Sequence, residues 1–249
     1  RGKMQTIRIQ KVIADTGFCS RRKAEELVLQ RRVKVNGHPA RIGQKIDPVR
    51  DLITIDGEKI IYNRKKQHVY LMMNKPRGYI TSMSDDRGRR CVTQLLPQTD
   101  VRVFPIGRLD LNTEGLLLFT SDGNFANDMM HPSRAVTKTY RVTVRPDITD
   151  EQAVKLSEGV MIDGRKTAPA EVRVLDKQPN RVVMELVIRE GRNRQVRKMC
   201  EAVGLEVARL KRTSVGPIKL GMLKPGTCRE LKAEELKALR AAVKKPERK

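Results

Sequence analysis

The first part of the chain changes its hydrophobic periodicity from a helical to a strand spacing. Apolar residues at the spacing of one helical face follow Gly17 and Ser20, which are placed to end one short helix and cap the next. This face consists of Ala24, Leu27 and Val28. Residues 31–37 and 52–55 instead alternate apolar and polar positions and run into Asn-Gly and Asp-Gly turns. The pattern predicts a helix pair and a small hairpin sheet within residues 1–62.

From residue 68 onward, strand-like segments alternate with helix-like segments. The expected strands are 69–73, 102–104, 116–120, 139–144 and 181–188. The expected helices are 125–130, 150–158, 193–203 and 233–243. Because these strands are mostly half polar and separated by turns, they predict a mixed or antiparallel sheet with flanking helices, an α+β fold. We interpret 63–67 as a linker, 68–243 as the second domain and 244–249 as a basic tail.

Charge adds the strongest compositional signal. The chain has 52 Lys and Arg against 29 Asp and Glu, a net charge of +23. This balance favours a polyanionic partner, because phosphate contacts by Lys and Arg release counterions. A merely solvated basic surface is the alternative. A membrane surface is a weaker one, since the C-terminal helix candidate mixes acidic with basic residues. No apolar run long enough for a membrane span and no secretory signal is apparent.

The cysteines and histidines point away from a metal site. The chain has 4 Cys and 3 His, which are scattered and include no CxxC pair. We therefore expect no metal and no other cofactor. The spacing is typical of a reduced, cytoplasmic protein, and no signal for an oligomer is visible, so a monomer is expected.

One loop is a candidate for chemistry. Gly107 and Gly115 bracket residues 108–114, and an apolar strand follows as far as an Asp-Gly turn. A carboxylate on a loop that is held by a buried strand, here Asp110, is a reasonable catalytic residue. The spacing alone fits a turn or helix-cap aspartate equally well, so it leaves both roles open.

The N-terminal block resembles the S4 RNA-binding domain. The resemblance rests on SRRKAE at 20–25, RRVKVNG at 31–37 and ITIDGEKI at 53–60. It implies contact with RNA, but S4 domains occur in many proteins and do not name the RNA. The phosphate-binding residues that it suggests are Arg21, Arg22, Lys23, Arg31, Arg32 and Lys34.

The second domain resembles the RsuA-type pseudouridine synthases. The signature GRLDLNTEGLLLFTSDG lies at 107–123. Three further motifs occur in the expected order: MNKPRGYITS at 73–82, KTYRVTV at 138–144 and EGRNRQVRKM at 190–199. An S4 domain in front of these motifs is usual in that family. The resemblance implies an enzyme that isomerises a uridine of ribosomal RNA to pseudouridine.

The resemblance also implies roles for individual residues. Asp110 would be the catalytic carboxylate, and Arg197 would keep it charged through paired hydrogen bonds. Tyr140 would stack on the uracil and help to move the C5 proton, and Arg108 would fill the gap left by the flipped base. A phosphate contact for Arg197 and a half-buried strand position for Tyr140 are the alternatives. Additional RNA-binding residues would be Arg192, Arg194 and Lys198.

Such a reaction fits a site with one carboxylate and no cofactor. It breaks the C1′–N1 bond, turns the base and joins C5 to C1′, with no redox step. As in glycoside cleavage, positive charge develops at the sugar carbon, where a carboxylate can act. An ionised Asp110 either attacks C1′ or removes a proton from C2′ to give a glycal. The base must leave its stack, which favours a structured RNA with an accessible loop.

The sequence leaves alternatives for the RNA substrate and for the function. Residues 107–136 are closest to the family members that modify the large subunit, so a 23S rRNA uridine is favoured over a 16S one. The substrate is free rRNA, a ribosomal subunit or an assembly intermediate. A non-catalytic ribosome-assembly factor would share the composition but would be expected to lose Asp110, Tyr140 or Arg197. A DNA-binding protein is disfavoured, because no helix-turn-helix or zinc-finger spacing is visible.

Overall fold

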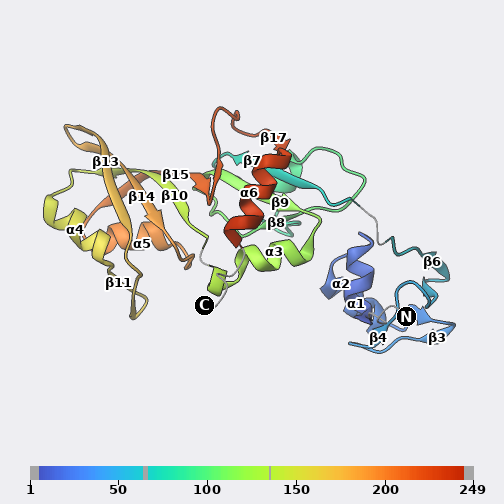
Figure 1. The fold of residues 1–249 in the computed structure, drawn as a ribbon. Helices are drawn as coiled ribbons and strands as arrows, with labels where there is room; N and C mark the ends of the chain where they lie inside the picture. Colours follow the sequence, from blue (N-terminus) through green and yellow to red (C-terminus); the bar gives the residue numbers. More distant parts are fainter. Residues whose placement is uncertain (1–5, 64–66, 135, 244–249) are drawn as a thin grey trace. The chain divides into compact units, whose positions relative to one another are not determined.

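The fold is known from a computed structural model, which describes residues 6–63, 67–134 and 136–243 (Figure 1). The chain divides into two compact units. The first is Arg1–Val69 with Thr99–Val103 and Ser121–Gly123, and the second is Tyr70–Gln98, Phe104–Thr120 and Asn124–Lys249. Residues 64–66 of the expected linker and the whole expected tail, 244–249, lie outside the described residues.

The N-terminal part of the first unit packs two helices against a small antiparallel sheet. The helices are α1 (Ile9–Asp15) and α2 (Arg21–Leu29). The sheet has the order β3-β2-β5-β6, with β2 (Val33–Val35), β3 (His38–Pro39), β5 (Ile53–Ile55) and β6 (Glu58–Ile60). A separate pair joins β1 (Ile7–Arg8) to β4 (Lys45–Ile46).

The local sequence signals of this unit are confirmed. The Ser20 hydroxyl accepts a hydrogen bond from the Lys23 backbone N–H at 3.1 Å and so caps α2. The predicted helical face, Ala24, Leu27 and Val28, is buried. Asn36 and Asp56 both have positive φ in the turns where the sequence predicts hairpins.

The second unit is built on a nine-stranded mixed sheet. Its main path runs β13-β14-β10-β15-β9-β7-β17, with β16 beside β15 and β8 beside β9. The strands are β7 (Tyr70–Lys75), β8 (Phe104–Ile106), β9 (Glu114–Thr120), β10 (Lys138–Arg145), β13 (Glu171–Gln178), β14 (Arg181–Ile188), β15 (Glu206–Val215), β16 (Ile218–Lys219) and β17 (Cys228–Glu230). Among the described strands, β9 and β15 pair in parallel and the other neighbours are antiparallel.

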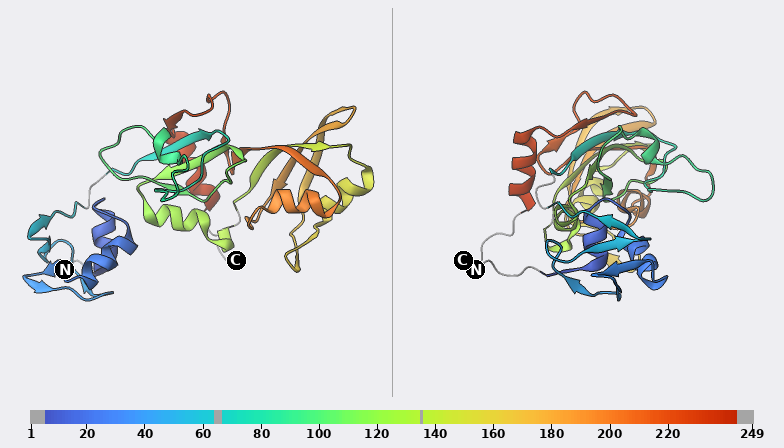
Figure 2. Two further views of the ribbon diagram at one scale, coloured as in Figure 1. Left: turned by 180° about the vertical axis from the view of Figure 1, so that it is seen from behind. Right: turned by 90° about the vertical axis from the view of Figure 1, so that its right-hand side faces the viewer.

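Helices cover the two halves of this sheet in separate cores (Figure 2). In one half, α3 (Gly123–Met130) and α6 (Ala233–Val243) pack with β7 and β9. In the other, α4 (Asp150–Glu158) and α5 (Gln195–Ala202) pack with β10 and β14. Short elements complete the unit: η1 (Val92–Leu95), η2 (Pro132–Arg134) and the hairpin of β11 (Met161–Ile162) and β12 (Arg165–Lys166). The predicted α+β fold with a mixed, mainly antiparallel sheet is confirmed.

The two halves of the sheet meet at a very short ladder. The parallel pairing of β15 with β9 registers Lys211 with Glu114 and Arg212 with Gly115. At Gly115 the backbones come so close that a Cβ atom would lie 2.1 Å from the carbonyl oxygen of Arg212. Gly115 also has a φ of +107°, so glycine is required here on two grounds.

None of the described helices has the length and the apolar character that a membrane span requires.

Candidate active site

Asp110 lies on the loop that joins β8 to β9, at the junction of the two sheet halves. The loop begins after Gly107, which has a φ of +77°, and ends as β9 enters the sheet at Glu114. Leu109, directly before Asp110, is 6% exposed and fixes the loop to the core. The predicted position of this carboxylate, on a loop before a buried strand, is therefore what the structure shows.

The backbone of this loop is held at five successive carbonyl groups. The Thr81 hydroxyl donates to Leu109 O at 2.8 Å, and the Gly78 N–H donates to Leu111 O at 2.8 Å. The other three carbonyls, of Asp110, Asn112 and Thr113, accept from lysine and arginine side chains. A loop with all of these groups satisfied has few alternative conformations, so it presents the Asp110 side chain in a fixed direction.

Lys75, the last residue of β7, provides two of these contacts. Its side chain is fully buried, and its ammonium donates to Asp110 O at 2.9 Å, Thr113 O at 2.8 Å and Pro76 O at 3.1 Å. Three acceptors match the three N–H bonds of an ammonium group. Burial lowers the pKa of Lys75 to about 8, although the charges of Asp110 and Glu114 act in the opposite direction.

The Asp110 carboxylate itself is partly exposed and has an arginine beside it. One of its oxygens lies 3.5 Å from Nη1 of Arg194, and the two side chains are 35% and 46% exposed. Arg194 precedes α5 with a left-handed φ of +49°. Arg194 is a predicted phosphate contact, and the structure places it next to the carboxylate. A long and partly exposed ion pair of this kind orients the groups but contributes little stability.

Arg197 holds the loop rather than the carboxylate in this structure. Its Nη2 donates to Asn112 O at 2.9 Å and lies 3.4 Å from the Thr113 hydroxyl. The paired hydrogen bonds to Asp110 that the sequence suggested are not present among the described contacts, although Asp110 acts on Arg197 electrostatically. Burial, followed by the charge of Arg194, lowers the pKa of Arg197. Its Nε is buried and has no partner among the described residues.

Tyr140 is brought to the same region by the register of the sheet. It lies opposite Arg212 on β15, and Arg212 lies beside Gly115 at the start of β9. Tyr140 is 9% exposed and packs in the core that includes Ile188 and Met199. The buried Arg212 donates from Nε to Leu116 O at 2.8 Å, which ties the two strands together.

Of the remaining predicted RNA-binding residues of the second unit, one is exposed and two contact other protein groups. Arg108 is exposed. Arg192 instead donates to the backbone carbonyl of Arg165 at 3.1 Å, and Lys198 pairs with Asp163 at 2.7 Å. These two cations hold the β11–β12 hairpin against the start of α5. Their contacts give them a structural task besides any contact with phosphate.

The predicted RNA-binding cations of the first unit gather at α2 and β2. Arg21, Arg22 and Lys23 occupy the first turn of α2, which contains no acidic residue. Positive side chains at a helix N-terminus oppose the helix dipole, so the arrangement favours a bound anion over stability of the free helix. Arg31 and Lys34 are exposed; Arg32 is also exposed but forms two hydrogen bonds to the carboxylate of Asp56.

Sequence reasoning missed two residues that position the loop. Lys75 and Thr81 both lie in the segment MNKPRGYITS, which was singled out as a motif without a role for either side chain. A lysine at the end of a largely apolar strand was the available signal, because a buried ammonium requires several acceptors. Among the described residues, no group of three or more His, Cys, Asp or Glu side chains is placed to hold a metal ion.

Comparison with known proteins identifies the family. Residues 69–202 match the family described as RNA pseudouridylate synthase, and residues 7–53 match the S4 domain. The chain is 45% identical over 237 residues to ribosomal large subunit pseudouridine synthase B of Bacillus subtilis (strain 168), covering 94% of this chain and 96% of the relative. It is 39% identical to the Pseudomonas aeruginosa protein of the same name, covering 95% of this chain and 62% of that protein.

A solved structure agrees with these matches. The crystal structure of a pseudouridylate synthase covers 94% of this chain and 99% of its own, with a TM-score of 0.67 and 29% sequence identity. The match extends over both the S4 segment and the mixed sheet with its loop. The chain therefore belongs to the RNA pseudouridine synthase family, in which it joins an S4 domain to the catalytic domain.

Proposed function

We propose that this enzyme isomerises a specific uridine of large-subunit ribosomal RNA and that Asp110 is its catalytic carboxylate. The large subunit is favoured because the Bacillus subtilis and Pseudomonas aeruginosa relatives are both named for it. A substrate of this kind also fits the net charge of +23. The two relatives are bacterial proteins, and bacteria make and modify ribosomal RNA in the cytoplasm, so this function also favours a cytoplasmic location.

The observation that carries the proposal is the way in which the Asp110 loop is held. Its carbonyls from Leu109 to Thr113 each accept a hydrogen bond from outside the loop, while the carboxylate stays open to a ligand. Such a loop needs little reorganisation when the substrate arrives. Preorganisation of a charged group is a main source of catalytic power in enzymes.

The chemistry requires the carboxylate at the ribose. As the C1′–N1 bond breaks, its electron pair leaves with the uracil and positive charge develops at C1′. Asp110 either adds to C1′ or accepts the C2′ proton, and the detached base turns. As C5 bonds to C1′, the ester bond between Asp110 and C1′ breaks or, in the glycal route, the C2′ proton returns from Asp110. C5 then loses its proton and N1 gains one, so the product is an isomer of the substrate and Asp110 is again a free carboxylate.

The neighbouring residues have supporting roles in this proposal. Tyr140 stacks on the uracil and helps to move the C5 proton. Arg197 fixes the loop through Asn112 O, and Arg194 faces the carboxylate at 3.5 Å. Arg108, which is exposed next to Asp110, enters the RNA helix as the base leaves it.

The experiment uses protein-free large-subunit and small-subunit rRNA transcripts, with isolated ribosomal subunits as a parallel series. Pseudouridine is mapped by chemical labelling and primer extension after incubation with the wild type or Asp110→Asn. The control variant is Asp150→Asn, because Asp150 is exposed in the first turn of α4. A new stop in one large-subunit helix, absent with Asp110→Asn and present with Asp150→Asn, is expected.

Each other outcome identifies what has failed. A stop in the small subunit contradicts the choice of substrate but keeps the role of Asp110. Full activity of Asp110→Asn overturns the assignment of the carboxylate. Tight, salt-dependent RNA binding without any new stop on transcripts or subunits favours a non-catalytic factor in ribosome assembly.

A further inference from the structure

The half of the sheet that contains β10, β14 and β15 has one face that carries arginines and is not covered by a described helix. Residues along β10 alternate between the two faces of the sheet. Tyr140, Val142 and Val144 point into the core beneath α4 and α5. Arg141, Thr143 and Arg145 point to the opposite face. In Figures 1 and 2, α4 and α5 lie on one side of β10, β14 and β15, and no described helix covers the other side.

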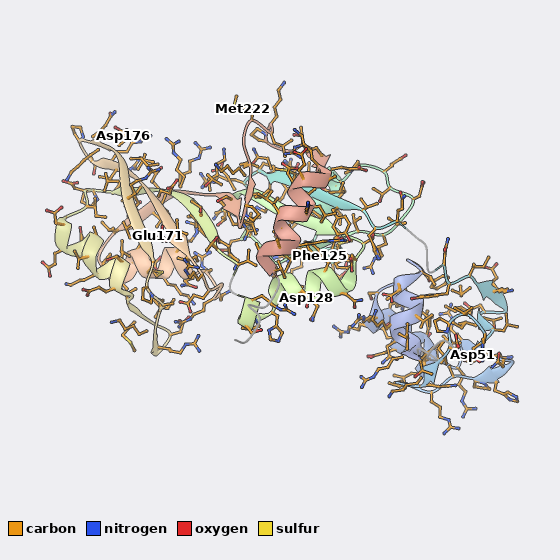
Figure 3. The ribbon with its side chains drawn as sticks, in the orientation of Figure 1. Asp51, Phe125, Asp128, Glu171, Asp176 and Met222 are labelled. Atoms are coloured by element: carbon orange, nitrogen blue, oxygen red, sulfur yellow. The ribbon has the colours of Figure 1, made fainter. Side chains whose placement is uncertain are left out.

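A broad cleft lies on this uncovered face. It encloses about 530 Å³ and is lined by residues of β10, β14 and β15 and by Arg77. Its nine lining residues include no carboxylate. Figure 3 shows nitrogen-tipped side chains gathered above β10 and β15, between the labelled Asp176 and Met222. We call the six lining cations the arginine face: Arg77, Arg141, Arg145, Arg181, Arg209 and Lys211.

Most charges of the arginine face are left without a protein partner. Arg209 pairs with Glu114 at 2.8 Å, and Arg181 with Asp176 at 3.5 Å. The other four cations form no ion pair with any described residue. An excess of cations in one cleft concentrates positive potential there, which attracts a polyanion rather than a single carboxylate.

The strand register makes this arrangement unfavourable for the free protein. Arg141 lies directly opposite Lys211, and like charges at opposed positions destabilise a sheet. On its other side Arg141 faces Glu185, but Glu185 is already paired with Arg173 at 3.2 Å. Glu185 and Glu114, the register partner of Lys211, are each paired with another arginine, so they offset this repulsion only in part. A phosphate bound beside Arg141 and Lys211 would offset it further.

The arginine face reaches the Asp110 loop through Arg77. Arg77 follows Lys75 by two residues, and its charge acts on both Glu114 and Arg197. Glu114, in turn, is the register partner of Lys211. Positively charged side chains therefore extend from the Asp110 loop, past Glu114 at the start of β9, to the arginine face. An RNA strand that leaves the active site in this direction meets cations along its path.

We propose that the arginine face binds the phosphate backbone of RNA that flanks the hairpin carrying the target uridine. This inference rests on the proposed function, because it takes the RNA substrate as the occupant. Arg141 and Arg145 lie four residues apart on one strand, a separation of about 13 Å. The face therefore contacts several successive phosphates and makes no selection among bases. It adds affinity for long RNA and leaves recognition of the uridine to the active site.

The test compares two charge-reversed proteins on two RNAs. The first variant is Arg141→Glu with Arg145→Glu. The matched control is Lys166→Glu with Lys237→Glu, which makes the same charge change at exposed positions of β12 and α6. Dissociation constants are measured by filter binding for a short large-subunit rRNA hairpin alone and for the same hairpin with long flanking arms, over a series of salt concentrations. Thermal unfolding of each protein shows whether the variant is folded.

The expected result is a selective loss of affinity for the extended RNA. The Arg141/Arg145 variant should bind it about tenfold or more weakly, and the salt slope should fall by about one for each phosphate contact removed. The hairpin alone should lose much less, and in turnover the loss should fall on KM rather than kcat. The control variant should bind both RNAs like the wild type.

Several results would overturn the proposal, and each is separable from failure of the proposed function. Equal losses for the hairpin and the extended RNA, or equal losses in both variants, indicate a general charge effect. Loss of binding to anionic lipid vesicles with no change for RNA would assign the face to a membrane surface. Binding is measured without turnover, so it tests the arginine face even if no RNA is modified.

Discussion

The ammonium group of Lys75 lies 2.9 Å from the backbone carbonyl oxygen of Asp110. A buried lysine thus supports the Asp110 loop from beneath, while the Asp110 carboxylate is partly exposed. The same ammonium reaches Thr113 O at 2.8 Å, so a single charged group spans the loop. This contact makes the geometry of the site depend on a side chain that never meets the substrate.

Replacing Lys75 should disable the loop without removing the carboxylate. In Lys75→Met, the carbonyls of Thr113 and Pro76 lose the lysine donor and stay buried or half-buried, and Asp110 O keeps only the Thr113 backbone N–H at 3.0 Å. Each unsatisfied carbonyl costs roughly 1–3 kcal/mol, which the loop relieves by moving. We expect kcat to fall at least tenfold, with RNA affinity within about threefold of the wild type. An unchanged kcat in a folded Lys75→Met protein would show that the loop is held by other contacts.

The pKa of Lys75, lowered to about 8 by burial, gives a prediction for stability against pH. Its ordinary value is 10.5, so between pH 8 and pH 10.5 the unfolded chain holds more protons at this residue than the folded chain. The contribution of Lys75 to the free energy of unfolding should therefore rise through this window, by roughly 3 kcal/mol in total. Below pH 8 it should be constant.

Two measurements check the titration of Lys75. The first is the unfolding free energy of the wild type minus that of Lys75→Met as a function of pH. The second is the ¹³Cε chemical shift of Lys75, identified by its absence from the variant. A midpoint above pH 10 would mean that the three carbonyl contacts outweigh the loss of hydration.

Gly115 should tolerate no side chain. In Gly115→Ala the new Cβ would sit 2.1 Å from Arg212 O, and the φ of +107° is unfavourable for alanine. We expect a loss of at least about 3 kcal/mol in unfolding free energy, since the two halves of the sheet must separate. Gly164→Ala is the control, because its φ is +75° and nothing lies within 4 Å of the added Cβ. Its loss should be near 1 kcal/mol, so equal losses in denaturant unfolding would contradict the steric argument.

The two arginines near Asp110 should respond differently to substitution. Arg197 is partly buried and supports Asn112 O, so Arg197→Gln should lower both kcat and stability. Arg194 meets the carboxylate at 3.5 Å between exposed side chains, so Arg194→Gln should change stability by less than about 0.5 kcal/mol. Its kcat should fall less than that of Arg197→Gln. The opposite order in single-turnover rates would make Arg194 the main partner of the carboxylate.

Much of the fold is predicted correctly by local sequence patterns, namely hydrophobic periodicity and helix-cap residues. The helix at Ala233–Val243 and the strand at Arg181–Ile188 have the bounds that the sequence predicted. Ser20 caps α2 as expected, because an N-cap signal depends only on neighbouring residues. The motif carrying Asp110 also predicted its loop, since glycines bracket it and an apolar strand follows.

The central strand was not predicted from the sequence. β15 carries Arg209, Lys211 and Arg212, so it lacks the apolar alternation that marks a strand. Its polar positions are explained only by distant partners: Glu114 for Arg209 and Leu116 O for Arg212. The partner of Asp110 escaped prediction for the same reason. Arg194 and Arg197 are close in sequence, and only the start of α5 decides which of them faces the carboxylate.

The place of β15 in the sheet has a consequence for synthesis of the protein. This strand ends at Val215, well after Asp110 in the sequence, yet it stands between β10 and β9 and joins the two halves. A growing polypeptide therefore makes the carboxylate of Asp110 long before the strand that completes its surroundings. Until that strand has left the ribosome, the nascent chain has two unpaired strand edges and no assembled site. The site can therefore be assembled only after synthesis of the chain has passed Val215.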